Sequence, residues 1–537
     1  MPLPFILLHY IPIVKANRVP NRFSVVLMLA LAVLAAFGAY WLLKKLRRSQ
    51  VLAVGGSVLL AGLIVFEHWS VPLPLTDARI PAVYEQVVAE PGDFAILQLP
   101  LGWRNSFGVQ GSESTQTQYY QTYHQKRLLS GNISRNPPFK FDYFARIPIL
   151  ESLIAIQAYD QVDVERRAQD REMAGDFVSF YDIRYVVVAP GVPGRPPYVD
   201  TRDDAVAYVE EVLPVDKIYD QEGWLLYRVN RPALRESLEV DMGTTEPRTL
   251  MAQGEGWAEA EAIQGINANW AQEQGARIFV PARAEKAHRL TMRALPFEFE
   301  GAHPQTVAPE INGKMLDPVT LTSGWNDYAW DVPAGLLLQG LNDVRFQVAR
   351  LDAPAEVLPG NGVIGGTGVQ APVAIEVSSG GPEGFAFITL GGGERAIDGS
   401  QHHPGYNVAV VDPKSGKLLD KDGFDTTPSG SEDNSRLLAN YIAAVPDGRI
   451  VVVVMQGDGA ALLTEDAVAA FNTIGGNLDP RGQAGWKHAI IGVKGAGPGG
   501  AMESGGPEPG DGWLRVAPDR RTLSIAVDRI LWEAVSP

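Results

Sequence analysis

The 537-residue sequence contains no cysteine, which excludes disulfide bonds, a thiolate nucleophile and a thiolate metal site. It also lacks several common catalytic motifs, because neither Gly-x-Ser-x-Gly nor His-Glu-x-x-His occurs. The glycine-rich stretch 495–512 has no Gly-Lys-Ser/Thr ending, which disfavours a phosphate-binding loop. We therefore expect no cofactor, no metal ion and no catalytic residue in this chain.

Basic residues are scarce outside the N-terminal region. Residues 1–66 contain seven cations and no acids, whereas the remainder carries 39 basic against 62 acidic residues. An acidic surface of this kind repels phosphate backbones and anionic lipid headgroups. The sequence therefore predicts no nucleic-acid partner.

Two long stretches lack charge altogether. Residues 23–43 and 49–66 are uncharged over 21 and 18 positions, enough to cross a hydrocarbon core of about 30 Å. Between them stand four cations, which favour a cytoplasmic turn: Lys44, Lys45, Arg47 and Arg48. We expect a cell-membrane protein with two spans and residues 67–537 outside the cytoplasm. An exported chain without any disulfide favours a bacterial source.

Two other interpretations of these stretches stay open. Residues 15–43 resemble a signal peptide in their basic start, although the apolar run is long and a second one follows. Both runs also have the composition of buried core helices, but charge-free stretches of this length are rare in soluble domains. The cations Lys15, Arg18 and Arg22 favour the opposite orientation.

Composition divides the chain into six segments. We predict an interfacial segment (1–21), a transmembrane hairpin (22–69), an extracytoplasmic α/β domain (70–232), an antiparallel, jelly-roll-like β-sandwich (233–358), a Gly-rich linker (359–372) and a C-terminal α/β module (373–537). In the last module we expect strands at 374–378, 386–390, 406–411, 449–455, 489–493 and 522–527, and helices at 435–444 and 464–474.

Three clusters of aromatic and polar residues are candidate sugar-binding sites, because aromatic faces stack on pyranose rings and polar groups bind hydroxyls. The first lies in the α/β domain and the second in the sandwich, and the third lies beside the most apolar strand of the last module: Tyr123, His124 and Arg135; Trp325, Asp327 and Tyr328; Asp458, Trp486, His488 and Lys494. The alternative for the first is packing at the headgroup level of a membrane. The alternatives for the others are a tryptophan core and a turn-capping aspartate.

The last module resembles the interleukin-like EMT inducer/PANDER family. The resemblance rests on an ordered set of motifs: 406–411, 415–420, 424–425, Ile442, 447–448, 450–454, 457–460, Leu463 and 491–495. His488 takes the place of a tryptophan found in animal members, with Trp486 two residues earlier. The same domain type forms the stem of an animal O-mannose N-acetylglucosaminyltransferase, where it holds sugar. The resemblance therefore implies a glycan ligand.

The first third of the chain is similar to the C-terminal end of membrane proteins of the glycosyltransferase C superfamily. The similarity rests on short motifs around both apolar runs and after them: 18–20, 22–23, Glu67, 97–100, 122–126 and 131–135. In that superfamily the catalytic acid lies in the first outer loop, which this chain does not contain. The similarity therefore implies a non-catalytic part.

These patterns together favour a membrane-anchored extracytoplasmic protein that binds and presents carbohydrate, accessory to cell-surface glycan assembly. The expected partners are a glycan or glycolipid, the lipid bilayer and a membrane glycosyltransferase. One alternative is the non-catalytic C-terminal part of a polytopic glycosyltransferase. Another is a surface protein-interaction module that binds no sugar.

Overall fold

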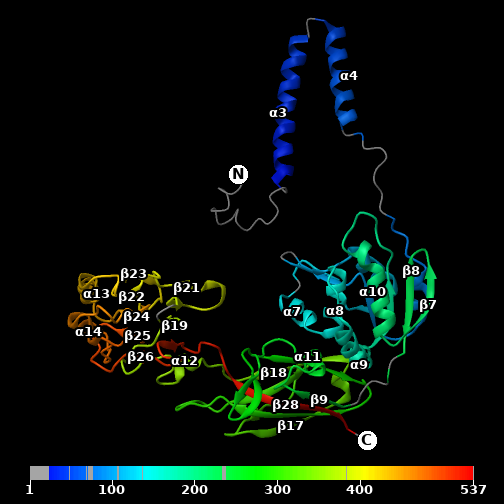
Figure 1. Cartoon of the computed structure of the whole chain (residues 1–537). Helices are drawn as coiled ribbons and strands as arrows, with labels where there is room; N and C mark the ends of the chain where they lie inside the picture. The colour runs from blue at the N-terminus through cyan, green and yellow to red at the C-terminus, as the bar shows by residue number, and fades with distance from the viewer. Residues whose placement is uncertain are drawn as a thin grey trace. The chain divides into compact units, whose positions relative to one another are not determined.

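A computed structural model describes residues 23–46, 49–67, 69, 77–105, 108–135, 137–230, 232, 237–381 and 384–535. The chain forms two compact units, Met1–Arg79 and Ile80–Pro537 (Figure 1). The predicted interfacial segment 1–21 and the last two cations of the basic turn, Arg47 and Arg48, lie outside the described residues.

The first unit contains the helices α3 (Phe23–Leu46) and α4 (Gln50–Glu67). Both are long and apolar enough to cross a membrane, and the apolar window of each is completely unburied in the protein. A helix that belonged to a soluble core would bury an apolar face. Length, composition and exposure therefore make α3 and α4 candidates for membrane spans.

The second unit begins with an α/β domain. A five-stranded sheet has the order β4-β1-β6-β8-β7, in which β1 pairs in parallel with β4 and β6. The helices are α5 (Val83–Ala89), α6 (Thr115–His124), α7 (Phe139–Ala145), α8 (Pro148–Gln157), α9 (Val164–Phe180) and α10 (Tyr198–Val212). The strands are β1 (Ala95–Leu99), β4 (Arg127–Leu128), β6 (Ile183–Val188), β7 (Val215–Gln221) and β8 (Trp224–Val229), and a small side sheet contains β2 (Gly102–Arg104), β3 (Val109–Gly111) and β5 (Gly131–Asn132).

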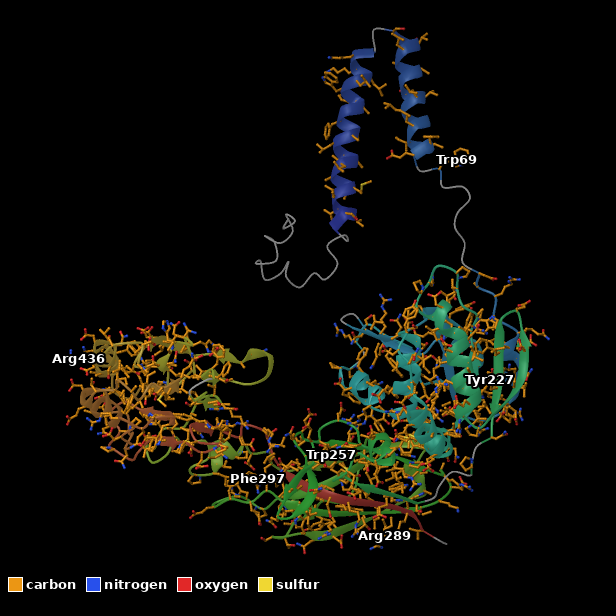
Figure 2. The ribbon with its side chains drawn as sticks, viewed as in Figure 1. Trp69, Tyr227, Trp257, Arg289, Phe297 and Arg436 are labelled. Carbon is orange, nitrogen blue, oxygen red and sulfur yellow. The ribbon has the colours of Figure 1, made fainter. Side chains whose placement is uncertain are left out.

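A β-sandwich follows, as its alternating sequence predicts. One sheet has the order β10-β11-β28-β13-β17 with β9 also paired to β28, and the other contains β12-β18-β14-β15 with β16 beside β14. The elements are β9 (Ser237–Asp241), α11 (Pro247–Ala252), β10 (Glu261–Ile263), β11 (Ile266–Trp270), β12 (Ala276–Ala282), β13 (His288–Pro296), β14 (Thr306–Ile311), β15 (Lys314–Met315), β16 (Val319–Thr320), β17 (Asn326–Val332), β18 (Gly340–Val348) and β28 (Ile525–Ala534). The labelled Trp257 and Phe297 both belong to this part of the chain (Figure 2).

The C-terminal strand corrects the predicted domain boundaries. Residues 522–527 were expected to belong to the last module, but β28 pairs with β13 and β9 in the sandwich, and Figure 1 shows it in red among the green strands. Trp532 and Ile530 of β28 are fully buried there. The last module is therefore inserted into the sandwich, between β18 and β28.

The predicted linker 359–372 is also not a free tether. Ile364 and Ala371 are fully buried in a core of the last module, and the side chain of Gln370 donates to the carbonyls of Ala355 and Asn361. A flexible linker would leave such apolar side chains in water. The segment is an ordered, packed part of the inserted module.

The inserted module has three layers. Its central sheet has the order β23-β22-β24-β25-β26, and a smaller sheet has the order β21-β20-β19-β27. The elements are α12 (Pro354–Val357), β19 (Ile375–Ser378), β20 (Phe387–Leu390), β21 (Ile397–Asp398), β22 (Gly405–Val411), β23 (Leu418–Phe424), α13 (Glu432–Ala444), β24 (Ile450–Gln456), α14 (Glu465–Asn472), β25 (Lys487–Val493), β26 (Met502–Gly506) and β27 (Trp513–Val516). Five of the six strands and both helices predicted for this module are present in it.

The uninterrupted apolar run of β24 explains the layering, because every residue of this strand is buried. Val451, Val453 and Met455 pack against the helices, whereas Val452 and Val454 pack against the small sheet. Successive side chains of a strand point to opposite faces, and a strand covered on both faces is apolar throughout. The small sheet thus covers one face of the central sheet, and the side chains on its own outer face do not belong to the core between the two sheets.

Candidate functional site

The candidate residues of the α/β domain do not share one surface. His124 is buried at the end of α6, its ring stacks on Tyr84 at 5.2 Å, and its Nδ1 accepts the backbone N–H of Lys126 at 3.0 Å. Burial lowers the pKa of His124 to about 4, so the imidazole is neutral at neutral pH. Tyr123 and Arg135 are exposed. Only these two can meet a ligand from solvent.

The sandwich candidates serve mainly as structure. Tyr328 is buried, and its hydroxyl accepts the backbone N–H of Thr322 at 2.9 Å. Asp327 is exposed and lies 3.7 Å from the guanidinium of Arg529. Trp325 is half-buried beside Arg293, and its indole N–H has no hydrogen-bond partner among the described residues. Asp327 and Tyr328 point to opposite faces of β17 because they are adjacent.

In the inserted module the four candidates divide between two ends of the central sheet. β24 and β25 are antiparallel, so Asp458 follows β24 at the end where β25 begins with Trp486 and His488 nearby. Lys494 lies at the other end of β25, about 20 Å away along the strand. The structure brings the first three to one end and separates Lys494 from them.

His488 is a core residue and not a surface ligand group. It is fully buried, with Nδ1 3.0 Å from the hydroxyl of Tyr406 and Nε2 2.9 Å from Oε1 of Glu503. Both ring nitrogens are therefore already bonded. Of the three candidates at this end, Asp458 and Trp486 remain partly exposed.

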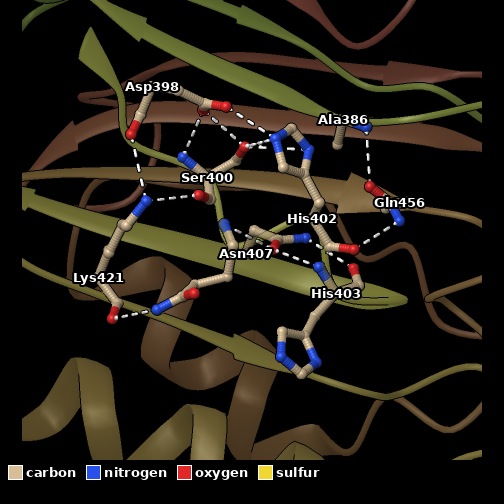
Figure 3. A network of polar contacts seen from close by, with 9 residues as sticks. Ala386, Asp398, Ser400, His402, His403, Asn407, Lys421 and Gln456 are labelled. Atoms are coloured by element: carbon tan, nitrogen blue, oxygen red, sulfur yellow. Dashed lines mark hydrogen bonds and ion pairs between the residues drawn. The ribbon is translucent and has the colours of Figure 1, made fainter.

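A polar network lies beside this end of the sheet (Figure 3). The side chain of Asn407 accepts the backbone N–H groups of Gln401 and His403, and the amide of Gln456 donates to the carbonyl of His402. The ammonium of Lys421 donates to the carbonyl of Ser400 at 2.8 Å. These bonds hold the loop 398–403 against the ends of β22 and β24.

The loop contains Asp398, Ser400 and His402, which superficially match a catalytic triad. The Ser400 hydroxyl donates to Oδ1 of Asp398 at 2.7 Å, and it lies 3.3 Å from both ring nitrogens of His402. A serine nucleophile must instead give its proton to the histidine. Partial burial alone would raise the pKa of Asp398, but the bonds from Ser400 and His402 lower it. The arrangement fixes the loop and does not activate the hydroxyl.

The network also positions an aromatic group at the surface. His402 adopts a left-handed backbone conformation, with φ of 54°, and its ring contacts the rings of Phe385 and Phe387 edge-on, with centroids 6.0 and 5.2 Å away. Phe385 is 66% and Phe387 is 49% exposed. Large apolar side chains exposed together mark interaction sites more often than single ones do.

The outer face of the small sheet presents two parallel rows of side chains. The aromatic row consists of Phe387, Ser378 and Trp513, which are paired in register across β20, β19 and β27. Trp513 is 48% exposed. The polar row lies two residues along the strands and contains Asp398, Thr389, Glu376 and Arg515. Paired residues in neighbouring strands point to the same face.

This surface was not predicted from the sequence, because β27 is far from β19 and β20 in the chain. The available signal was the segment 385–389, which places phenylalanine on one face of the strand and alanine and isoleucine on the other. A strand on the outside of a module normally alternates apolar with polar residues. Among the described residues, no three His, Asp or Glu side chains are grouped closely enough to hold a metal ion.

Comparison with known proteins identifies the centre of the inserted module. Residues 404–496 match the family model described as Interleukin-like EMT inducer, which confirms the resemblance predicted for this segment. The aromatic and polar rows lie outside these residues, on the strands that flank them in the chain. No comparison tests the similarity of the first third to glycosyltransferase C proteins, which stays a prediction.

Two curated relatives are named cell migration-inducing and hyaluronan-binding protein. The human protein (Homo sapiens) is 42% and the mouse protein (Mus musculus) 40% identical over 73 residues. The match covers 14% of this chain and only 5% of the length of either relative.

The structural likenesses are weak. The CBM36-1 domain of a multidomain xylanase from the hindgut metagenome of Trinervitermes trinervoides is 13% identical with a TM-score of 0.16, covering 21% of this chain and 82% of that domain. CBM35 from Cellvibrio japonicus Abf62 is 19% identical with a TM-score of 0.15, with the same coverage of both chains. At these scores neither likeness carries a conclusion about this chain.

Proposed function

We propose that this chain binds and presents carbohydrate outside the cytoplasm, anchored by the hairpin of α3 and α4. The observation that carries the proposal is the outer face of the small sheet, where exposed aromatic rings alternate with hydrogen-bonding side chains. Aromatic faces bind the C–H faces of sugars, and carboxylate, hydroxyl and guanidinium groups bind their hydroxyls. The chain needs no catalytic residue for this role.

The similarity over 73 residues to relatives whose name includes hyaluronan-binding supports a saccharide ligand as a class. The binding face belongs to a module that is connected to the sandwich by both of its chain ends. Weak sugar sites also gain from high local concentration when many copies are held on one membrane. The chain therefore suits an accessory role in cell-surface glycan assembly, with a glycan or glycolipid as ligand and a membrane glycosyltransferase as neighbour.

A glycan array tests the proposal. The full chain in lipid nanodiscs should bind at least one class of saccharide, and the double variant Phe387→Ala/Trp513→Ala should lose that signal. The exposed Leu437 on α13 offers a matched control, since Leu437→Ala removes a comparable apolar side chain from the same module. Binding to no saccharide of any class would contradict the proposal and favour a protein-interaction module.

Orientation is tested separately by adding protease to intact cells. With the turn at Lys44 and Lys45 in the cytoplasm, residues 67–537 are accessible and should be digested. Protection of these residues in intact cells, with digestion only after lysis, would reverse the proposed orientation.

A further inference from the structure

The two rows on the small sheet define the geometry of any ligand that binds there. Neighbouring strands lie about 4.8 Å apart, so Phe387 and Trp513, two strands apart, lie about 10 Å from one another. A single pyranose ring is too small to stack on both. The small side chain of Ser378 between them leaves room for a ligand to pass from one ring to the other.

The polar row runs parallel to the aromatic row at a distance of about 7 Å, two residues along each strand. A sugar chain stacked on the aromatic row therefore has its equatorial hydroxyls beside Thr389 and Glu376. The carboxylate of Glu376 also orients the platform, because the Trp513 indole N–H donates to its Oε1 at 3.3 Å. A stacking surface and a line of hydrogen-bonding groups thus extend together across three strands.

The charges beside the rings select against acidic ligands. The side chains of Glu376 and Asp398 are 47% and 46% exposed on this face. The Nε of Arg515 lies 3.8 Å from Glu376, and the ammonium of Lys421 is bonded to backbone carbonyls. The carboxylates are engaged as well, Glu376 by Arg515 and Trp513, and Asp398 by Ser400 and His402. Neither Arg515 nor Lys421 is therefore left to balance the carboxylate of a uronic acid, which would lose its hydration without gaining a partner.

Other occupants fit this face less well. A stable protein interface buries about 800 Å² on each partner around an apolar centre, whereas here Ser378 separates Phe387 from Trp513 and a polar row lies beside them. An anionic membrane surface would meet the same two carboxylates. The alternation of rings and hydrogen-bonding groups suits a ligand that is itself alternately apolar and polar along its length.

We infer that the small sheet binds an uncharged, linear saccharide chain, which lies across β20, β19 and β27 and stacks different sugar units on Phe387 and Trp513. This inference rests on the proposed function and goes further by assigning the site, the class of saccharide and its direction on the sheet. The edge formed by Phe385 and His402 extends the same surface beyond Phe387.

Chain length gives the first test. The full chain in nanodiscs is titrated calorimetrically with cello-, xylo-, manno- and chito-oligosaccharides of one to six units. Affinity for the best series should rise steeply between two and four units and then level off, because the second ring is reached only by a longer ligand. Equal affinity for a monosaccharide and a tetrasaccharide would overturn the inference and indicate a single-sugar pocket.

Single substitutions give the second test. Loss of one stacked ring in Trp513→Ala or Phe387→Ala should weaken tetrasaccharide binding roughly fivefold to tenfold and remove the gain from the longer ligand. Leu437→Ala should leave both unchanged. Unchanged thermal melting of all three variants separates lost binding from lost folding. Tetrasaccharide binding that survives both ring substitutions would place the site elsewhere.

Charge gives the third test. The wild-type chain should not bind the polyuronate alginate, whereas Glu376→Gln, which keeps the shape and removes the charge, should increase alginate binding relative to wild type. Tighter binding of wild type to alginate than to every neutral series would overturn the inference but leave carbohydrate binding intact. Failure of all saccharides, neutral and acidic, would instead contradict the proposed function itself.

Discussion

The Nε2 atom of His488 lies 2.9 Å from Oε1 of Glu503, and the two side chains are 0% and 9% exposed. Oε2 of Glu503 accepts the backbone N–H groups of Asn477 and Leu478 at 2.6 and 3.0 Å. A nearly buried carboxylate is tolerated only when its lone pairs are bonded in this way. The pair fixes β25, β26 and the segment after α14 to one another.

His488→Ala should therefore destabilise the inserted module strongly. Removing one member of a buried pair leaves the other without its partner, which costs about 3–5 kcal/mol. Glu503→Gln should cost less, because the amide oxygen still accepts the backbone N–H groups. Thermal melting of both variants measures the difference. A His488→Ala variant as stable as wild type would show that this histidine is not structural.

Low pH should weaken the interaction between His488 and Glu503. Burial alone would raise the pKa of Glu503, but the bonds from His488 and from the backbone N–H groups outweigh burial and hold the pKa below its usual value. A carboxyl with a lowered folded-state pKa stabilises the protein above its unfolded pKa of about 4.3, and the stabilisation is lost as pH falls further. The melting temperature of the module should fall below that pH, and the fall should be smaller in Glu503→Gln.

The stability of the α/β domain should also depend on pH, in a higher pH range, because of His124. Its pKa is about 4 in the folded protein because of burial, against about 6.5 in the unfolded chain. Between these values the unfolded state binds more protons, so stability falls as pH is lowered from about 6.5 to 4. This difference between the folded and unfolded pKa values corresponds to a loss of folding stability on the order of 3 kcal/mol.

The variant His124→Gln tests this origin of the pH dependence. Glutamine cannot titrate, but its amide oxygen can accept the Lys126 N–H that Nδ1 accepts in the native protein. Melting curves of the α/β domain between pH 4 and 7 should be flatter in this variant than in wild type. An identical slope in both proteins would assign the pH dependence to other groups.

The sequence was sufficient to predict the elements whose signals are local. The apolar run 449–455 predicted a buried strand, and the alternation in the sandwich predicted its class, because each pattern lies within one element. Pairing between distant strands has no local signal. For this reason the sequence places the strand 522–527 in the last module, whereas His288 of β13 pairs with Ala534 of β28 although most of the sandwich and the whole insertion lie between them in the chain.

The same reason limited the prediction of the site. Residue type alone made His488 a candidate ligand group, but it shares a strand face with the buried Ile490, which packs toward the helices. The position of His488 on the same strand face as Ile490 was readable from the sequence, because they are two residues apart. The aromatic row was not, because it depends on the register that aligns Ser378 with Phe387 and Trp513.

Membrane attachment should depend on the first unit alone. The full chain should remain with membranes after alkaline carbonate extraction, because two apolar helices with the length of α3 and α4 would bury their surfaces in a bilayer. A variant that begins at Ala78 should be soluble and should keep the melting transitions of the second unit, whose compact fold begins at Ile80. Extraction of the full chain by carbonate would contradict the anchoring role.

The inserted position of the last module leads to a final prediction about stability. Asp352 and Leu523 exchange two backbone hydrogen bonds, of 3.0 and 2.9 Å, so the chain leaves and re-enters the sandwich at one place. Replacing residues 359–518 by a short Gly/Ser loop should therefore leave the sandwich folded. Deleting 525–537 should instead unfold it, because the fully buried Val527, Ile530 and Trp532 are lost from β28, at several kcal/mol for such large core side chains. Circular dichroism during heating compares both variants with the intact protein. A sandwich that melted normally without β28 would contradict the discontinuous domain.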